Sequence, residues 1–372
     1  MLVCHIITGL GSGGAERMLG RIVISAQQPP NTCHMVVSLT GEDIHGPAIR
    51  ASGVQLYCLN IQKLREVPLA FWSLVRLLHR YKPDVIMTWL YHADLFGTFA
   101  AITAGLGRKR LVWNLRCSDI DFSRYAYSTK IICRLLAYLS FLPAQVITNS
   151  QAGRRHHLSL GYKPQKWGYL PNGFDTSEWY PDAEDRENVR IEFGLSAHDV
   201  AIVVVARHDP QKDHTTFLAA ADKLAKRYSK VKFILIGRNT QNIPLPNALR
   251  NKMIVLGERT DVARLLRGMD IAVLSSAYGE GFPNVVGEAM ATGLPCVVTD
   301  VGDSALIVED TGIVVPPRNP DSLADAIQIL IDDPDLQNRG AEARRIIIGC
   351  YSIDVVRERY QKLFSDIHAN SN

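Results

Sequence analysis

The sequence predicts an α/β protein made of two doubly wound parallel-sheet domains, and three observations support this. The chain has 372 residues, enough for two domains of about 100–200 residues each. Short runs rich in Val, Ile and aromatic residues alternate with helix-length stretches, which is typical of a parallel sheet covered on both faces. A stretch rich in Pro, Gly, Asn and acidic residues, 170–189, interrupts the alternation, which then starts again.

The first half contains six strand-like runs with helix-length stretches between them, such as 15–25 and 67–79. The runs are 2–8, 34–39, 54–61, 84–89, 110–116 and 144–150. They predict an N-terminal domain over residues 1–172, followed by a linker over 173–187.

The second half repeats this order, with six further strand-like runs. These are 200–207, 232–237, 253–257, 271–276, 295–300 and 312–316. They predict a C-terminal domain over 188–350, followed by an amphipathic helix within 351–372. Ligands of open parallel sheets bind beyond the carboxyl ends of the strands, so we expect the two domains to face each other across a substrate cleft.

Composition excludes several classes of protein. The seven cysteines have wide spacings and no C-x-x-C pair, so neither a disulfide framework nor a zinc site is expected, and free thiols indicate a reducing compartment. No apolar run reaches the roughly 18–20 residues that span a bilayer, and the N-terminus lacks the basic region of a secretory signal. We therefore expect a cytoplasmic protein that does not cross a membrane.

The charge is distributed unevenly. Residues 1–180 carry 19 Lys and Arg against 10 Asp and Glu, whereas the rest carries 22 against 27, for a net charge of +4. A basic first half indicates an anionic partner, and a solvated surface without a partner is the alternative.

Gly9, Gly11 and Gly14 have the G-x-G-x-x-G spacing of a phosphate-binding loop between a strand and a helix. A dinucleotide site would also need an acidic residue at the end of the second strand to hold a ribose. Glu42 and Asp43 come late, after a glycine. The loop therefore indicates phosphate binding, with a purely structural turn as the alternative.

The segment 275–300 carries two carboxylates around a helix start. Asn284 stands where an N-cap is expected, Glu280 precedes the helix, and Glu288 lies one turn inside it. A helix N-terminus attracts an anion and carboxylates accept hydrogen bonds from hydroxyls, so the pair suits sugar hydroxyls on either side of a diphosphate. A turn residue and a solvated helix glutamate are the alternatives.

Two cations follow the first strand of the second half. Arg207 leaves the strand and Lys212 comes five residues later, after Pro210. A pair of positive charges at this edge can neutralise a diphosphate as it departs. Either cation by itself is also compatible with a surface charge.

The segments that carry these features are "GSGGAER", "VARHDPQKDH", "EGFPNVVGEAMATGLPCVVTD" and "GIVVPPRNPDSLADAI". Over nearly the whole chain the sequence resembles the retaining glycosyltransferases of family 4 (group 1), which have the GT-B fold. The resemblance implies a nucleotide-sugar donor bound mainly by the C-terminal domain. It implies that Arg207 and Lys212 hold the donor diphosphate, Glu280 the sugar hydroxyls and Glu288 the ribose.

The resemblance also implies roles for backbone groups. The N–H groups of Asn284, Val285 and Val286 are expected around the phosphates, and the loop at Gly13 and Gly14 approaches them from the N-terminal domain. The last helix, within 351–372, is expected to return to the N-terminal domain.

One departure from the family concerns a histidine near the reacting sugar, because this chain has Arg116 where many relatives carry that residue. His92, after the preceding strand, is the other candidate, with a surface histidine as the alternative. The sequence assigns no general base, since for many members the departing phosphate is thought to take the acceptor proton. No metal or other cofactor is expected, because Arg207 and Lys212 can supply the positive charge.

The N-terminal domain is expected to bind an anionic acceptor. Its basic residues include Arg108, Lys109, Arg110, Arg116, Arg124, Lys130, Arg134, Arg154 and Arg155. An apolar helix-like stretch, 127–143, lies beside them, a combination that indicates a seat on an anionic lipid surface at the inner face of the cytoplasmic membrane. A polyprenyl-diphosphate-linked saccharide would account for both features, whereas a soluble acceptor and a helix packed on the sheet are the alternatives.

Three other functions compete with glycosyl transfer. A nicotinamide oxidoreductase would leave Arg207, Lys212 and the two glutamates unexplained. A sugar-nucleotide epimerase or hydrolase of the same fold would convert the donor without an acceptor, and a non-catalytic sensor would bind it without turnover. Nucleic acid is not an expected partner, and the sequence predicts neither the nucleotide, sugar, acceptor and linkage nor the oligomeric state.

Overall fold

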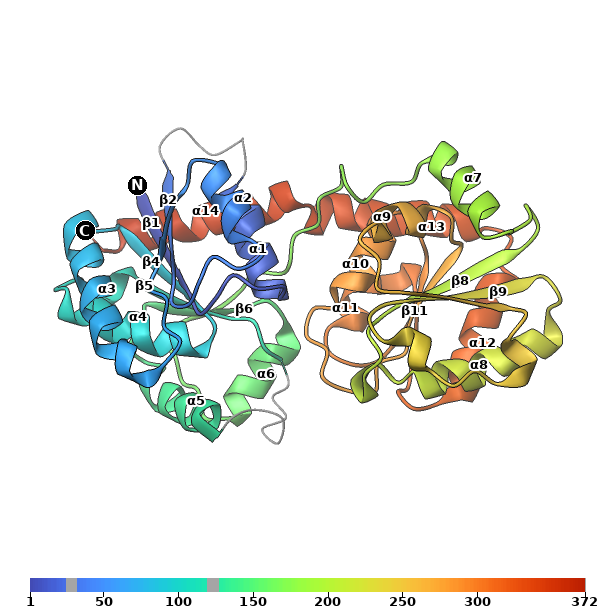
Figure 1. Ribbon diagram of the computed structural model, residues 1–372, viewed down its shortest axis with the longest axis horizontal. Coiled ribbons are helices and arrows are strands. Elements are labelled where there is room, and N and C mark those ends of the chain that lie inside the picture. The colour runs from blue at the N-terminus through green and yellow to red at the C-terminus, as the bar shows by residue number, and fades with distance from the viewer. Residues whose placement is uncertain (25–31, 119–126, 372) are drawn as a thin grey trace. The chain divides into compact units, whose positions relative to one another are not determined.

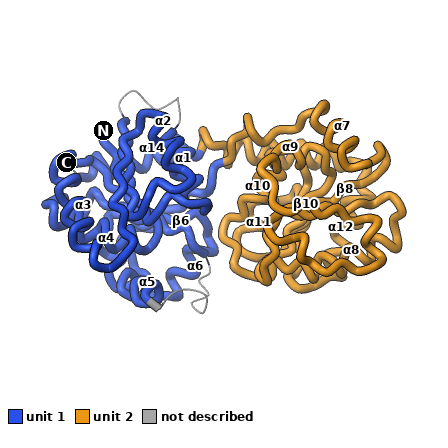
Figure 2. The backbone as a smooth tube through the Cα atoms, viewed as in Figure 1, with its two compact units in different colours: residues 1–173, 356–372 blue, residues 174–355 orange. Residues whose placement is uncertain are grey.

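The computed structural model describes residues 1–24, 32–118 and 127–371. The chain forms two compact units, which Figure 2 distinguishes by colour. Unit 1 consists of Met1–Gly173 and Val356–Asn372, and unit 2 consists of Phe174–Val355. The chain therefore passes from one unit to the other twice.

Unit 1 is built on a parallel sheet of seven strands in the order β3-β2-β1-β4-β5-β6-β7. The strands are β1 (Leu2–Ile7), β2 (Cys33–Ser38), β3 (Gln55–Cys58), β4 (Val85–Trp89), β5 (Leu111–Leu115), β6 (Gln145–Thr148) and β7 (Trp167–Tyr169). Ile7 at the end of β1 pairs with Ser38 on one side and Trp89 on the other. The strand order thus reverses between β1 and β4, which is where ligands of open α/β sheets bind.

Helices cover both faces of this sheet (Figure 1). They are α1 (Gly14–Val23), α2 (Gly46–Ala51), α3 (Val67–Tyr81), α4 (Tyr91–Thr103), α5 (Tyr127–Leu139), α6 (Gln151–Ser159) and α14 (Ile353–Ala369). Tyr360 of α14 is fully buried, its ring stacks on Trp89 of β4, and its hydroxyl accepts a hydrogen bond from Asn114 of β5 at 3.2 Å. The last helix therefore returns to unit 1, as predicted.

Unit 2 repeats the arrangement with six parallel strands in the order β10-β9-β8-β11-β12-β13. They are β8 (Val200–Val205), β9 (Val231–Ile236), β10 (Met253–Gly257), β11 (Ile271–Leu274), β12 (Cys296–Thr299) and β13 (Ile313–Val315). The strand order reverses between β8 and β11, so the switch point of unit 2 lies at the carboxyl ends of these two strands.

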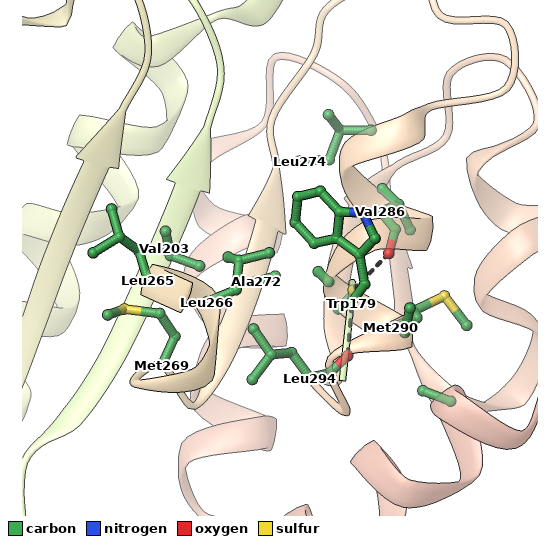
Figure 3. Close-up of a cluster of buried hydrophobic side chains, with 14 of the residues drawn as sticks. Trp179, Val203, Leu265, Leu266, Met269, Ala272, Leu274, Val286, Met290 and Leu294 are labelled. Carbon is green, nitrogen blue, oxygen red and sulfur yellow. Dashed lines mark hydrogen bonds between the residues drawn. The ribbon is translucent and has the colours of Figure 1, made fainter. Parts of the chain in front are cut away.

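The helices of unit 2 enclose an apolar core on each face of the sheet. They are α7 (Ala183–Glu192), α8 (His214–Arg227), α9 (Val262–Arg267), α10 (Asn284–Ala291), α11 (Ser304–Val308), α12 (Pro320–Ile331) and α13 (Leu336–Ile346). Figure 3 shows one core, in which Val203 of β8 and Leu274 of β11 belong to the same cluster as Val286 and Met290 of α10.

The predicted fold class is confirmed, but the segment expected as a linker, 173–187, belongs to unit 2 from Phe174 onwards. Phe174 is fully buried and Trp179 is 5% exposed in the core shown in Figure 3, and α7 begins at Ala183. Residues 174–182 form irregular backbone, and the side chains of Phe174 and Trp179 anchor it in the core of unit 2.

Candidate functional site

The segment after β8 presents Arg207 and Lys212 on a short, capped turn. Asp209 begins a 3₁₀-helix, Pro210–Lys212, by accepting a hydrogen bond from the N–H of Gln211 at 2.9 Å. Asp213 has a left-handed backbone (φ 45°) and caps α8 through the N–H of Thr216 at 3.1 Å. Lys212 therefore lies between two caps, which fix its backbone, whereas the Arg207 side chain is 48% exposed.

The segment after β11 is hydrogen-bonded to this turn. The N–H of Ala277 donates to the carbonyl of Gln211 at 2.8 Å, and the Gln211 side chain donates to the carbonyl of Gly279 at 2.9 Å. The hydroxyl of Ser275 donates to the carbonyl of Lys212 at 2.9 Å. The two loops that meet at the switch point of unit 2 thus form one hydrogen-bonded structure.

Glu280 and Lys212, predicted from separate motifs, form an ion pair inside this structure. The ammonium group of Lys212 contacts Oε1 of Glu280, and the hydroxyl of Ser276 donates to the same oxygen at 2.6 Å. The two charged side chains are only 14% and 9% exposed. A buried pair of this kind is tolerated because each charge compensates the other and a hydroxyl also solvates the carboxylate.

The turn after β12 supports the Glu280 loop from behind. Gly302 has φ +68°, and a Cβ atom there would lie 2.4 Å from the carbonyl oxygen of Glu280. The N–H of Asp303 donates to the carbonyl of Gly281 at 2.8 Å, and the hydroxyl of Thr299 donates to the carbonyl of Ser276 at 2.7 Å. Only glycine allows the backbones to approach this closely.

Helix α10 starts at Asn284, but its N-cap is Pro283 rather than Asn284. Pro283 has extended backbone and lacks an N–H group, so it precedes the helix at no loss of a donor. The N–H of Val286 donates to the Pro283 carbonyl at 3.2 Å, and the amides of Asn284 and Val285 come before it in the first turn. Glu288 is 5% exposed, so it is not a solvated surface glutamate.

In unit 1, the glycine loop follows β1 at the switch point. Helix α1 begins at Gly14 with Gly13 as N-cap, and both glycines are exposed. The Glu16 carboxylate lies beside Gly13 in the first turn and accepts a hydrogen bond from its own backbone N–H. Gly9 has a packing role, because a Cβ atom there would lie 2.7 Å from the Thr40 hydroxyl oxygen. The N-terminal turn of the helix is exposed, and an anion bound there would lie beside the Glu16 carboxylate.

The acidic residues after β2 are engaged within unit 1. Asp43 accepts a hydrogen bond from the N–H of Leu10 at 3.3 Å, and Glu42 pairs with Arg50. Glu42 and Asp43 thus support the glycine loop and the start of α2, which disfavours the ribose contact that a nicotinamide site requires.

His92 lies at the start of α4, beside the strained residue Leu90. Leu90 has φ 73° and ψ 154°, a conformation that is normally restricted to glycine. His92 is exposed, and desolvation of its ring lowers its pKa. The carboxyl end of β4 thus presents an exposed imidazole whose pKa is lowered by partial desolvation.

Arg116, the other candidate in unit 1, is half-buried. Its Nη1 donates at 3.4 Å to the carbonyl of Leu170 and to the hydroxyl of Tyr360, and its guanidinium lies 5.4 Å from the ring centre of Trp89. Burial lowers its pKa, and Nη2 has no hydrogen-bond partner in the part of the chain that the structure describes. Arg116 therefore holds the end of β5 to α14.

Several supporting residues carry no signal in the sequence. Ser276, Gln211 and Gly302 act through contacts between loops that are far apart along the chain. Of the basic residues of the first half, Arg110 donates to the Pro83 carbonyl at 3.0 Å, and Arg124 lies outside the described residues.

Two kinds of feature are absent from residues 1–24, 32–118 and 127–371, namely metal-binding clusters and membrane-spanning helices. No group of three or more His, Cys, Asp or Glu side chains in these ranges is arranged to hold a metal ion. No helix within them is long and apolar enough to span a bilayer.

Two family models match the chain. "Glycosyltransferase Family 4" matches residues 12–178, and "Glycosyl transferases group 1" matches residues 199–333. EpsF of Bacillus subtilis, which carries a glycosyltransferase name, is 30% identical over 80% of this chain and 79% of its own length.

Two further relatives have names that state a lipid-linked acceptor. The UDP-Gal:α-D-GlcNAc-diphosphoundecaprenol α-1,3-galactosyltransferase of Escherichia coli is 24% identical and covers 87% of this chain and 85% of its own. The N,N'-diacetylbacillosaminyl-diphospho-undecaprenol α-1,3-N-acetylgalactosaminyltransferase of Campylobacter jejuni is 26% identical and covers 81% of each.

Among solved structures, HepE of Anabaena in complex with UDP has the same fold. Its TM-score is 0.84 at 21% identity, over 98% of this chain and 100% of its own. HepE has also been solved with UDP-glucose, at a TM-score of 0.79 over the same shares of the two chains.

Proposed function

Because the chain belongs to the glycosyltransferases of group 1 and family 4, we propose that it transfers a hexosyl group from a UDP-sugar to a polyprenyl-diphosphate-linked saccharide, with retention of anomeric configuration. The Lys212–Glu280 pair at the switch point of unit 2 carries this proposal. It combines a cation for a diphosphate with a carboxylate for sugar hydroxyls in one hydrogen-bonded loop structure.

The donor site is proposed at the carboxyl ends of β8 and β11. Arg207 and Lys212 hold the diphosphate together with the first-turn amides of α10, while Glu280 accepts hydrogen bonds from the sugar and Glu288 from the ribose. UDP is favoured as the nucleotide because HepE binds UDP and UDP-glucose in its crystals and the E. coli relative is named for UDP-Gal.

The chemical step breaks the bond between the anomeric carbon and the diphosphate oxygen. Negative charge grows on the departing diphosphate, and Arg207, Lys212 and the positive end of the α10 dipole stabilise it. The acceptor hydroxyl attacks the same face of the sugar and passes its proton to the departing phosphate. The protein contributes positioning and charge stabilisation, and these cations do the work that a metal ion does elsewhere.

Unit 1 is proposed to bind the acceptor. It is the basic half of the chain, with 19 Lys and Arg against 10 Asp and Glu over residues 1–180. The names of the E. coli and C. jejuni relatives state undecaprenyl-diphosphate-linked acceptors. Gly13, Gly14 and His92 lie at the switch point of this unit. We assign Gly13 and Gly14 to the donor diphosphate and His92 to the acceptor sugar. A polyprenyl acceptor requires the enzyme to work at a membrane, which we propose to be the cytoplasmic face.

The experiment has a binding and a turnover stage. UDP, GDP, ADP and NADH are compared by thermal shift, and UDP is expected to raise the Tm, because a ligand at 100 times its Kd stabilises the folded state by about 2.7 kcal/mol. UDP-hexoses are then incubated with a polyprenyl-diphosphate-linked acetamido sugar, and the anomeric coupling of the product is read by NMR. Stabilisation by NADH alone, donor hydrolysis without an acceptor, or an inverted product would each contradict the proposal.

A further inference from the structure

The outer face of three neighbouring helices in unit 1 carries seven large exposed apolar side chains. We call it the α3–α5 face. Its exposed apolar residues are Leu69 and Trp72 on α3, Phe99 and Ile102 on α4, and Ile131, Leu135 and Tyr138 on α5. Tyr138 is 78% exposed and Leu69 is 72% exposed. Soluble proteins rarely gather so much apolar surface without a partner for it.

The three helices lie side by side on one face of the sheet, as Figure 1 shows. The rings of Phe71 on α3 and Phe96 on α4 are in contact, with centroids 5.6 Å apart. Each helix packs its opposite side into the core, through Leu74, Ala100 and Leu136 respectively. The exposed side chains are therefore a second apolar stripe on helices whose core contacts are already made.

The exposed charges on these three helices have one sign. The sequences of α3, α4 and α5 contain a single acidic residue, Asp94, which is fully buried. The bases on the helices are Arg76 and Arg80 on α3, both exposed, and Lys130 and Arg134 on α5, half-buried and exposed respectively. Arg108 and Lys109 follow α4 and are exposed as well.

We propose that the α3–α5 face docks on a bilayer that contains anionic lipids. The aromatic and aliphatic side chains enter the boundary between headgroups and acyl chains, and the arginines and lysines meet the lipid phosphates. Trp and Tyr beside Lys and Arg is the composition of a helix that lies in a membrane interface. The exposed charges on these helices are all basic, which suits the phosphates of an anionic lipid surface. The inference deepens the proposed function, whose acceptor lies in a membrane, but its evidence is this surface alone.

The test is flotation of the full-length protein with two kinds of vesicle. One contains phosphatidylcholine only and the other phosphatidylcholine with 30% phosphatidylglycerol, a composition of about one anionic lipid in three. The wild type is expected to float with the anionic vesicles and to be released by high salt. The double variant Ile131→Glu, Leu135→Glu is expected to lose at least tenfold in vesicle binding. The matched control is Ile191→Glu, Ile329→Glu, two exposed isoleucines of unit 2, which are 69% and 57% exposed.

Two further measurements make each outcome decisive. The thermal shift with UDP is expected to be the same in the wild type and the double variant, which shows intact folding and separates this inference from the proposed donor site. Light scattering reports whether the face joins two copies of the chain. Equal flotation of the double variant and the wild type, equal binding to neutral vesicles, or a wild-type dimer that the double variant breaks without any vesicle binding would each overturn the proposal.

Discussion

In the proposed reaction the Lys212 ammonium group has two anionic partners, the Glu280 carboxylate and the donor diphosphate. This affects how the nucleoside diphosphate binds. In the structure the ammonium group is paired with the Glu280 carboxylate, which also accepts the Ser276 hydroxyl. A diphosphate that binds Lys212 must compete with that carboxylate, and the carboxylate is then free to accept from the sugar. Charge on Glu280 therefore opposes binding of the nucleoside diphosphate by itself and favours binding of the intact donor.

The substitution Glu280→Gln tests this competition. The amide keeps the shape and still accepts from Ser276, but it removes the negative charge from Lys212. We expect kcat/KM to fall by about 100-fold or more, the loss of about 3 kcal/mol of transition-state stabilisation. UDP binding, measured by calorimetry, is expected to become several-fold tighter. Glu184→Gln, an exposed position on α7, is the control, and weaker UDP binding in Glu280→Gln would contradict the competition.

Ser276 is expected to act on the reaction through Glu280. Its hydroxyl lies 2.6 Å from the carboxylate and the residue is fully buried. Ser276→Ala removes a hydrogen bond to a charged group, an interaction of about 1.5–3 kcal/mol. We expect kcat to fall about tenfold or more with little change in UDP affinity, and Ser276→Thr to recover part of the activity. An alanine variant with unchanged kcat would show that Lys212 alone positions the carboxylate.

At the scale of elements, the site depends on three loops that follow β8, β11 and β12. Gly302 in the third loop is the tightest point, because its φ is +68° and a Cβ atom would lie 2.4 Å from the Glu280 carbonyl oxygen. Gly302→Ala is expected to lower the free energy of unfolding by about 1–3 kcal/mol and to displace the Glu280 loop. The loss of activity should therefore exceed what the loss of stability explains. Denaturation measures the free energy of unfolding, and kcat measures the activity. Gly349→Ala, where a Cβ atom meets nothing within 4 Å, is the comparison, and equal behaviour of the two variants would contradict this account.

Long, apolar elements were predictable from the sequence, whereas short ones depend on tertiary contacts. The run 200–207 contains β8, and the stretch 67–79 lies within α3. Strand β7 was missed because it has three residues with Gly168 at its centre, too few to show a period. Glycine is needed there, since a Cβ atom at Gly168 would lie 2.4 Å from the Gln145 side chain.

The same division applies to the site. Residue types and their place after strands indicated Lys212 and Glu280, because phosphate and sugar chemistry needs these groups at carboxyl ends. Their ion pair and the support from Ser276 and Gly302 arise where separate loops meet, and no local pattern encodes that meeting. Arg116, predicted from its position after β5, contacts Trp89 and Tyr360 in the structure. Its place in the site stays a prediction, because these contacts are also formed between distant segments.

At the scale of the whole molecule, histidine side chains in the interior of unit 1 connect several of its elements. In unit 1 the Trp89 indole donates to Nδ1 of His5 at 3.2 Å, so Nε2 of His5 donates to His34 at 2.9 Å, and both rings contact Phe364 of α14. His157 accepts from the Tyr91 hydroxyl at 2.7 Å and donates to the Gly153 carbonyl at the same distance. Each of these networks requires neutral imidazole.

Acid is therefore expected to destabilise the fold. Burial lowers the pKa of His5, and it lowers those of His34, His157 and His214 to about 4. Unfolded histidine titrates near 6.5, so between about pH 6.5 and pH 4 the unfolded chain binds more protons than the folded one. The free energy of unfolding thus rises with pH through this window. At pH 5 it is lower than at neutral pH by on the order of 1–2 kcal/mol for each such histidine.

The measurement is urea denaturation at several pH values between 4.5 and 7.5. His157→Gln removes one titrating group while an amide can still bond to Tyr91, so its free energy of unfolding should depend less steeply on pH below about 6.5. His198→Gln, at an exposed position, is the control. If His157→Gln kept the full wild-type slope while lowering stability equally at every pH, His157 would contribute through packing alone. The acid sensitivity would then have to come from the His5–His34 network or from His214.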